Sequence, residues 1–77
     1  MALTLFGTSG CHLCDEAQEM LLTLGVEHTL IDIVDLPEGL ILFGTRIPVV
    51  GALNGPQLDW PFSLLDLIVF CGLTNTE

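Results

Sequence analysis

The amino-acid sequence predicts an α/β protein with the element order β-α-β-α-β-β-α, in which a four-stranded mixed sheet is flanked by helices. Three observations carry this prediction. Two β-favouring segments, residues 2–6 and 26–33, flank an amphipathic helical pattern. The dipeptide Asn54-Gly55 follows a third apolar segment and is the strongest short hairpin signal. A capping sequence then precedes an apolar helical run that extends to Cys71.

The first half of the chain has the pattern of a βαβ unit. Residues 2–6 predict a short buried strand, and residues 7–10 supply the turn into a helix. Gly25 suits the left-handed position just past the end of this helix. Because a helix joins the two strands, we expect them to be parallel neighbours with a right-handed crossover. The apolar residues predicted to share one face of the helix are Leu13, Ala17, Met20, Leu21 and Leu24.

A short second helix is predicted over residues 37–43. Asp35 is a candidate cap, and Pro37 lies near a first-turn position, where proline is tolerated. Gly39 weakens this prediction, since glycine is a poor helix former. Residues 47–53 then have the composition of a strand.

The chain closes with a hairpin and a helix. The Asn54-Gly55 turn makes the strand before it antiparallel to the strand after it, which begins at Gln57. Ser63 and Asp66 have the spacing of a capping box, although aspartate is shorter than the preferred glutamate. The last helix is therefore predicted to run to Cys71, before Gly72.

Composition and charge restrict the function. The chain has 77 residues, of which 51% are hydrophobic, so we expect one domain, residues 1–77, with a rich apolar core. Its longest apolar stretches are far shorter than the roughly 20 residues of a membrane span. The formal net charge is -9, with no lysine and Arg46 as the single arginine. Such a charge opposes binding to nucleic acid or anionic lipid, and it serves either ordinary solubility or the choice of a basic partner.

The most informative residues are Cys11 and Cys14, which lie three positions apart at the predicted start of the first helix. The unsatisfied N–H groups and the positive end of the helix dipole stabilise a thiolate there. We therefore predict that Cys11 is the attacking thiol and that Cys14, one turn further in, is the resolving thiol. His12 would tune the pKa of Cys11 as a neighbouring cation, whereas the acidic residues that follow raise it.

Other interpretations of this pair are a permanent disulfide, half of a zinc site, or two cysteines with no task. Zinc would have to recruit Cys71, His12 or His28, which form no second closely spaced pair, so we expect no metal site. The N-terminal residues lack a basic region followed by a long apolar core, which favours the cytoplasm over export and argues against a permanent disulfide.

Three further residues favour structural roles. Cys71 lies in the apolar last helix and is expected to behave as a small core residue. Trp60 is interpreted as a packing anchor beside Pro61 and Phe62. His28 falls in the second strand and is interpreted as a structural histidine.

With its CxxC after the first strand, the predicted order resembles the thioredoxin fold in its minimal, glutaredoxin-sized form. Over almost its whole length the chain is similar to the small bacterial glutaredoxin-like proteins. The segments that carry the resemblance are the CxxC itself, residues 46–50, the Asn54-Gly55 hairpin and residues 58–62. The resemblance implies that a cis peptide bond precedes Pro48, that Pro48 packs near the cysteines, and that the backbone of Ile47 pairs with an extended substrate.

The resemblance is incomplete where glutaredoxins hold glutathione. They use a glycine pair and an aspartate at the start of the last helix, with a basic residue near the nucleophile, whereas residues 58–62 lack adjacent glycines and no basic residue precedes Cys11. Arg46 either binds a carboxylate of glutathione or of a partner, or is a solvated loop residue. Asp59 is a turn or helix cap in preference to a glutathione ligand. The candidate substrate-binding residues are Arg46, Ile47, Pro48 and Asp59.

The leading hypothesis is a monomeric, cytoplasmic thiol-disulfide oxidoreductase that acts on a disulfide-containing protein or on glutathione. It would hold no tightly bound cofactor, and glutathione is a candidate reductant. A second hypothesis is a noncatalytic interaction or redox-sensing module that keeps the fold. A third is a metal or iron-sulfur carrier that uses Cys11, as some glutaredoxins do.

Overall fold

The computed structural model describes residues 3–72. Its elements follow the predicted order, with one additional 3-10 turn, η1, after the second strand. They are β1 (Leu3–Gly7), α1 (His12–Thr23), β2 (His28–Asp32), η1 (Ile33–Asp35), α2 (Gly39–Phe43), β3 (Val49–Gly51), β4 (Gln57–Asp59) and α3 (Leu64–Phe70). Within residues 3–72, none of the helices combines the length and the apolar content that crossing a membrane requires.

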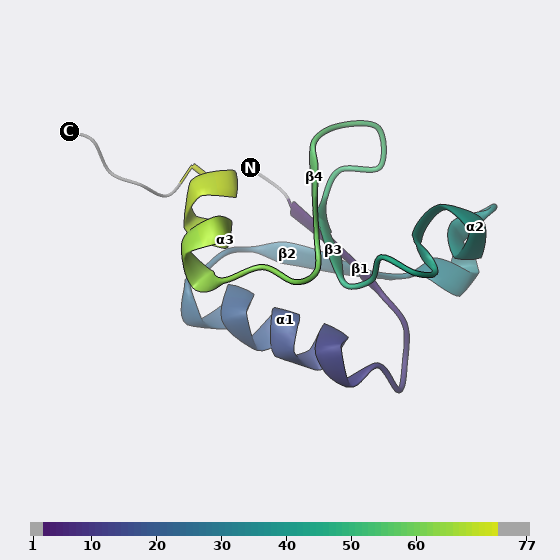
Figure 1. The fold of residues 1–77 in the computed structure, drawn as a ribbon, viewed down its shortest axis with the longest axis horizontal. Coiled ribbons are helices and arrows are strands. Elements are labelled where there is room, and N and C mark those ends of the chain that lie inside the picture. Colours follow the sequence, from purple (N-terminus) through teal and green to yellow (C-terminus); the bar gives the residue numbers. More distant parts are fainter. Residues whose placement is uncertain (1–2, 73–77) are drawn as a thin grey trace.

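The four strands form one mixed sheet in the order β2-β1-β3-β4 (Figure 1). β1 pairs in parallel with β2, with Leu5 opposite Leu30. It pairs antiparallel with β3, and β3 pairs antiparallel with β4. The predicted four-stranded mixed sheet, the parallel βαβ unit and the antiparallel hairpin are therefore confirmed.

Side chains of the central strands alternate between two cores, as the two-residue period of a strand requires. Leu5 and Val50 point to the face covered by α1 and α3, whereas Phe6 and Val49 point to the face covered by η1 and α2. We call the first cluster the large core; its buried members are Leu3, Leu5, Ala17, Leu21, Val50, Phe62 and Leu67. We call the second the small core; its buried members are Phe6, Ile33, Phe43 and Val49.

Helix α1 packs on the large core along one line of side chains. Cys14, Ala17 and Leu21 are buried on this line. Leu13 was predicted on the same face, but it is 40% exposed because it lies at the margin of that line. The helix ends as predicted, since Gly25 is left-handed with φ 71° and its N–H donates to the carbonyl of Leu22.

The second helix is shorter than predicted and begins differently. Asp35 belongs to η1 and does not cap α2, so that part of the prediction is wrong. The residue before α2 is Glu38, which adopts the left-handed conformation with φ 59°. Gly39 is buried, and a β-carbon there would overlap the carbonyl of Ile33. The glycine that weakens the helical pattern is therefore required by close packing between α2 and η1.

The C-terminal half follows the predicted pattern with shorter elements. β3 covers only residues 49–51 of the predicted 47–53. The capping box at the start of α3 is confirmed: Ser63 Oγ accepts from the N–H of Asp66 at 3.0 Å, and Asp66 Oδ2 accepts from the N–H of Ser63 at 2.9 Å. α3 ends at Phe70, and Gly72 behind it is left-handed with φ 70°.

Candidate redox site

Cys11 and Cys14 are joined by a disulfide, with their Cα atoms 5.2 Å apart. Cys11 is the N-cap of α1 and has extended backbone angles, φ -94° and ψ 107°. Its Sγ accepts a hydrogen bond from the N–H of Cys14 at 3.1 Å. Cys11 is half-buried, whereas Cys14 is only 7% exposed. The predicted asymmetry between an accessible and a covered sulfur is therefore present.

Gly7, at the end of β1, lies directly against the covered sulfur. A β-carbon at Gly7 would lie 2.8 Å from Cys14 Sγ, which is too close for these atoms, and 3.1 Å from Cys14 Cβ, which is a tight contact. Glycine is therefore needed here for the close approach of strand and helix. In the sequence, Gly7 was interpreted only as a turn residue, although its position between the first strand and the CxxC was a signal for this close approach.

Pro48 is the neighbour of Gly7 across the β1–β3 pair. Phe6 pairs with Val49, so the next step along these antiparallel strands places Gly7 alongside Pro48. Pro48 is fully buried, and the peptide bond before it is cis, as the resemblance implies. The strand register thus brings Pro48 and the CxxC to the same end of β1. A second cis bond, between Trp60 and Pro61, was not predicted.

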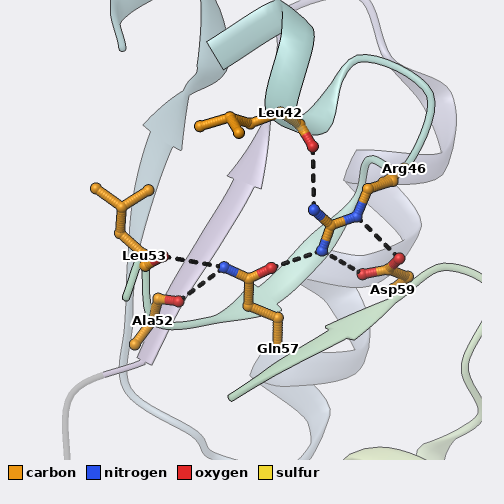
Figure 2. Close-up of polar contacts among 6 residues, drawn as sticks. All are labelled: Leu42, Arg46, Ala52, Leu53, Gln57 and Asp59. Atoms are coloured by element: carbon orange, nitrogen blue, oxygen red, sulfur yellow. Dashed lines mark hydrogen bonds and ion pairs between the residues drawn. The ribbon is translucent and has the colours of Figure 1, made fainter. Parts of the chain in front are cut away.

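Arg46 is held by several partners within the chain (Figure 2). Its Nε and Nη2 donate to the two carboxylate oxygens of Asp59 at 2.9 and 2.8 Å. Nη1 donates to the carbonyl of Leu42 at 3.0 Å, and Nη2 also donates to Gln57 Oε1. The guanidinium carbon lies 5.1 Å from the centre of the Phe43 ring. We call Arg46, Asp59 and Gln57 the arginine clamp.

The clamp changes the titration of its two charged members. The hydrogen bond from Arg46 holds the pKa of the Asp59 carboxyl below its ordinary value, and partial burial opposes this shift. The same hydrogen bond raises the pKa of Arg46. The side chain of Gln57 is itself held by the hairpin, because its Nε2 donates to the carbonyls of Ala52 and Leu53 at 2.9 and 3.3 Å. This fixes the position of the Gln57 oxygen that accepts from Arg46. No feature of the sequence pointed to Gln57.

Two sequence interpretations of the clamp residues do not describe the structure. Arg46 lies in a loop and is 35% exposed, but it is not simply solvated, because the carboxylate of Asp59 in the same chain binds it. Asp59 does not cap the last helix; Ser63 does. The physical reason is the hairpin, which returns Asp59 opposite Val49 and so beside the loop that carries Arg46.

The remaining predicted site residues lie on either side of the CxxC. His12 is exposed on the first turn of α1, and its Nε2 lies 2.9 Å from Glu16 Oε2. Ile47 is half-buried, and its N–H donates to the carbonyl of Phe43 at 3.1 Å. The Ile47 N–H is therefore already hydrogen-bonded within the loop. Only the Ile47 carbonyl is left for the predicted pairing with a substrate strand.

A hollow of about 250 Å³ opens beside Cys14, between the end of β1, the first turns of α1 and the end of β2. Two acidic residues, Asp15 and Asp32, are among those that line it. With exposed Glu16 close by on α1, the surroundings of the covered sulfur are acidic. Such a field repels anions and attracts cations.

The residues interpreted as structural occupy supporting positions. His28 Nδ1 lies 2.9 Å from the carbonyl of Val26. Trp60 is half-buried and makes an edge contact with Phe62, with ring centroids 5.0 Å apart. Cys71 is half-buried against the large core, and burial raises the pKa of its thiol. His28 and Trp60 match the sequence interpretation, whereas Cys71 caps the end of α3 and packs at the margin of the core instead of inside it.

A four-stranded mixed sheet with three helices, a CxxC at the start of the first helix and a cis-proline loop beside it define a protein of the thioredoxin-like class. The glutaredoxin-like domain family (DUF836) matches residues 2–69. The chain belongs to this family. No curated protein matches the sequence.

Solved structures agree with this assignment. The X-ray structure of the structural-genomics target protein XcR50 from X. campestris is 32% identical, with a TM-score of 0.81, over 95% of this chain and 99% of that chain. The solution structure of the same protein is 33% identical, with a TM-score of 0.79, over the full length of both chains. Thioredoxin 1 from Thermosipho africanus TCF52B is 17% identical, with a TM-score of 0.61, over 95% of this chain and 92% of that chain, and shares the fold.

Proposed function

We propose that the protein is a thiol-disulfide oxidoreductase in which Cys11 attacks and Cys14 resolves. The observation that carries the proposal is the asymmetry of the pair: Cys11 caps α1 and is accessible, whereas Cys14 is covered by Gly7 and the core. An accessible sulfur at a helix N-terminus is suited to attack, because the first-turn N–H groups stabilise its thiolate.

The proposed reaction has two exchange steps. The Cys11 thiolate attacks one sulfur of a substrate disulfide, a mixed disulfide forms, and the other substrate sulfur leaves as a thiolate that takes a proton. The Cys14 thiolate then attacks Cys11 Sγ, the intramolecular disulfide forms, and the second substrate sulfur leaves. The substrate gains two electrons and two protons, which the cysteine pair loses. A separate dithiol must return them, and we place the cycle in the reducing cytoplasm.

The hydrogen bond from the N–H of Cys14 to Cys11 Sγ supports these roles. It links the two residues within one helical turn, and it would strengthen as negative charge develops on Cys11. Pro48 is buried next to Gly7, and Gly7 lies against Cys14. An extended substrate segment that binds at the Pro48 loop would therefore lie near Cys11.

Cysteine variants test the assignment. Cys11→Ser should abolish reduction of a model disulfide, because the attacking thiolate is lost. Cys14→Ser should accumulate a mixed disulfide on Cys11, detectable by intact-protein mass spectrometry. Cys71→Ala is the matched control, since it also removes one thiol and should retain turnover. Normal turnover in both Cys11→Ser and Cys14→Ser would contradict these roles. If the wild-type protein does not reduce model disulfides, a noncatalytic module is favoured instead.

A further inference from the structure

The arginine clamp leaves one N–H donor of Arg46 for a ligand, although the side chain is 35% exposed. A guanidinium has five N–H donors. Four of them are used by Asp59, Gln57 and the Leu42 carbonyl, and one guanidinium edge is paired with both oxygens of a single carboxylate. This is the bidentate arrangement in which arginine recognises a carboxylate, and a residue of the same chain already fills it.

No other arginine or lysine can take its place, because the sequence contains only this one. The ionisable residues around the cysteine pair are mostly acidic: Asp15 and Asp32 line the hollow beside Cys14, and Glu16 on α1 lies 2.9 Å from the exposed His12 imidazole. Glutathione carries more carboxylates than ammonium groups at neutral pH. The site therefore offers it no free arginine or lysine, and the carboxylates of Asp15 and Asp32 oppose its approach by charge repulsion.

We propose that Asp59 and Gln57 occupy Arg46 and so make it unavailable to a ligand. As a result, the Cys11–Cys14 pair selects against glutathione and takes its electrons from a polypeptide dithiol flanked by basic residues. This inference rests on the proposed function. In this step a partner thiolate attacks Cys11 Sγ, and Cys14 leaves as a thiolate that takes a proton. The second partner thiolate then attacks the partner sulfur of the mixed disulfide and releases Cys11. Two electrons and two protons pass to the cysteine pair, and the partner becomes a disulfide.

Binding without chemistry tests the clamp directly. S-methylglutathione has the carboxylates of glutathione but no free thiol, so it can be titrated into the oxidised protein and followed by NMR. The wild-type protein should bind it weakly. Asp59→Asn removes the competing carboxylate charge with little change in size, and should tighten binding about tenfold, the effect of about 1.4 kcal/mol.

Two controls separate a freed arginine from a change in net charge. Asp35→Asn makes the same chemical change at an exposed position outside the clamp, and should bind as the wild type does. Adding Arg46→Gln to Asp59→Asn should cancel the gain, because the freed guanidinium is then absent. Wild-type binding as tight as that of Asp59→Asn, or a gain that survives in the double variant, would overturn the inference.

Electron donors test the partner chemistry with the wild-type protein alone. Two peptides share one Cys-Gly-Pro-Cys core, and one has lysine flanks where the other has glutamate flanks. The lysine-flanked dithiol should reduce the Cys11–Cys14 disulfide about tenfold faster at low salt, and the difference should shrink in 1 M salt, where the Debye length is about 3 Å. Equal rates, or a faster glutamate-flanked peptide, would contradict the inference.

These outcomes are separable from failure of the proposed function. If neither peptide nor glutathione reduces the pair, thiol-disulfide exchange as the function fails, while the S-methylglutathione titration still decides whether the clamp withholds Arg46. If both peptides and glutathione react at equal rates, exchange stands and the selectivity proposed here is wrong.

Discussion

The large core and the small core support the two sides of the candidate site in different ways. The large core buries side chains from α1, α3 and the sheet, and it holds the helix that carries both cysteines. The small core rests on a stacked pair, Phe6 and Phe43, with ring centroids 4.6 Å apart. It holds the loop of Arg46 and Pro48, and a polar clamp completes its support. The difference indicates that the sulfur side is fixed by apolar burial, whereas the loop side depends on a few specific contacts.

The largest expected effect is in the large core. Leu21→Ala should lower the free energy of unfolding by about 2–5 kcal/mol, because Leu21 is fully buried between α1 and the sheet and the substitution leaves a cavity. Denaturant unfolding of the oxidised protein measures it. Leu22→Ala, one residue away and 63% exposed, should cost less than about 0.5 kcal/mol. Equal losses in the two variants would mean that α1 is not held by this core.

The next effect is in the small core. Phe43→Leu should cost about 1–2 kcal/mol, because the stack with Phe6 and the ring beneath Arg46 are lost while most apolar volume is kept. The loop should respond locally: the N–H groups of Arg46 and Ile47, which both donate to the carbonyl of Phe43, should exchange faster with solvent.

The control for this variant lies on the same short helix. Ile41→Ala changes a side chain that is 83% exposed and should leave both stability and exchange nearly unchanged. If Ile41→Ala accelerates exchange as much as Phe43→Leu does, α2 as a whole supports the loop and the stack has no special part.

A smaller effect is the pH dependence of the clamp. The pKa of Asp59 is lowered in the folded protein by its hydrogen bond with Arg46. The clamp therefore adds to the free energy of unfolding above the ordinary aspartate pKa, and this stabilisation is lost as the pH falls through the lowered pKa of the folded state. Because the pair is partly exposed, solvent screening keeps this contribution below about 1 kcal/mol. Unfolding of wild type and Asp59→Asn at neutral and acidic pH should differ at neutral pH and converge in acid. A constant difference would contradict the assignment.

The smallest effect concerns the thiol beside the large core. Burial raises the pKa of Cys71, so less of it is thiolate near neutral pH. In the oxidised protein, iodoacetamide should therefore modify Cys71 more slowly than it modifies Cys71 in the denatured chain, as followed by mass spectrometry. Equal rates would show that the large core does not protect this thiol.

Local patterns were enough for much of the fold. The strand-helix-strand order, Gly25 after α1, the Asn54-Gly55 hairpin and the Ser63/Asp66 capping box each depend on neighbouring residues, and each is present. The cysteine pair was predictable for the same reason, because helical spacing alone brings its two residues together.

Only the tertiary structure decided what lies across the sheet. The end of β1 brings Gly7 against Cys14 and alongside Pro48, and the hairpin returns Asp59 and Gln57 to Arg46. These contacts join residues distant in the chain, so no local period or propensity encodes them. The sequence determined which groups can react, whereas strand register determined which groups are free to bind, because a charge already paired inside the fold is no longer available to a ligand.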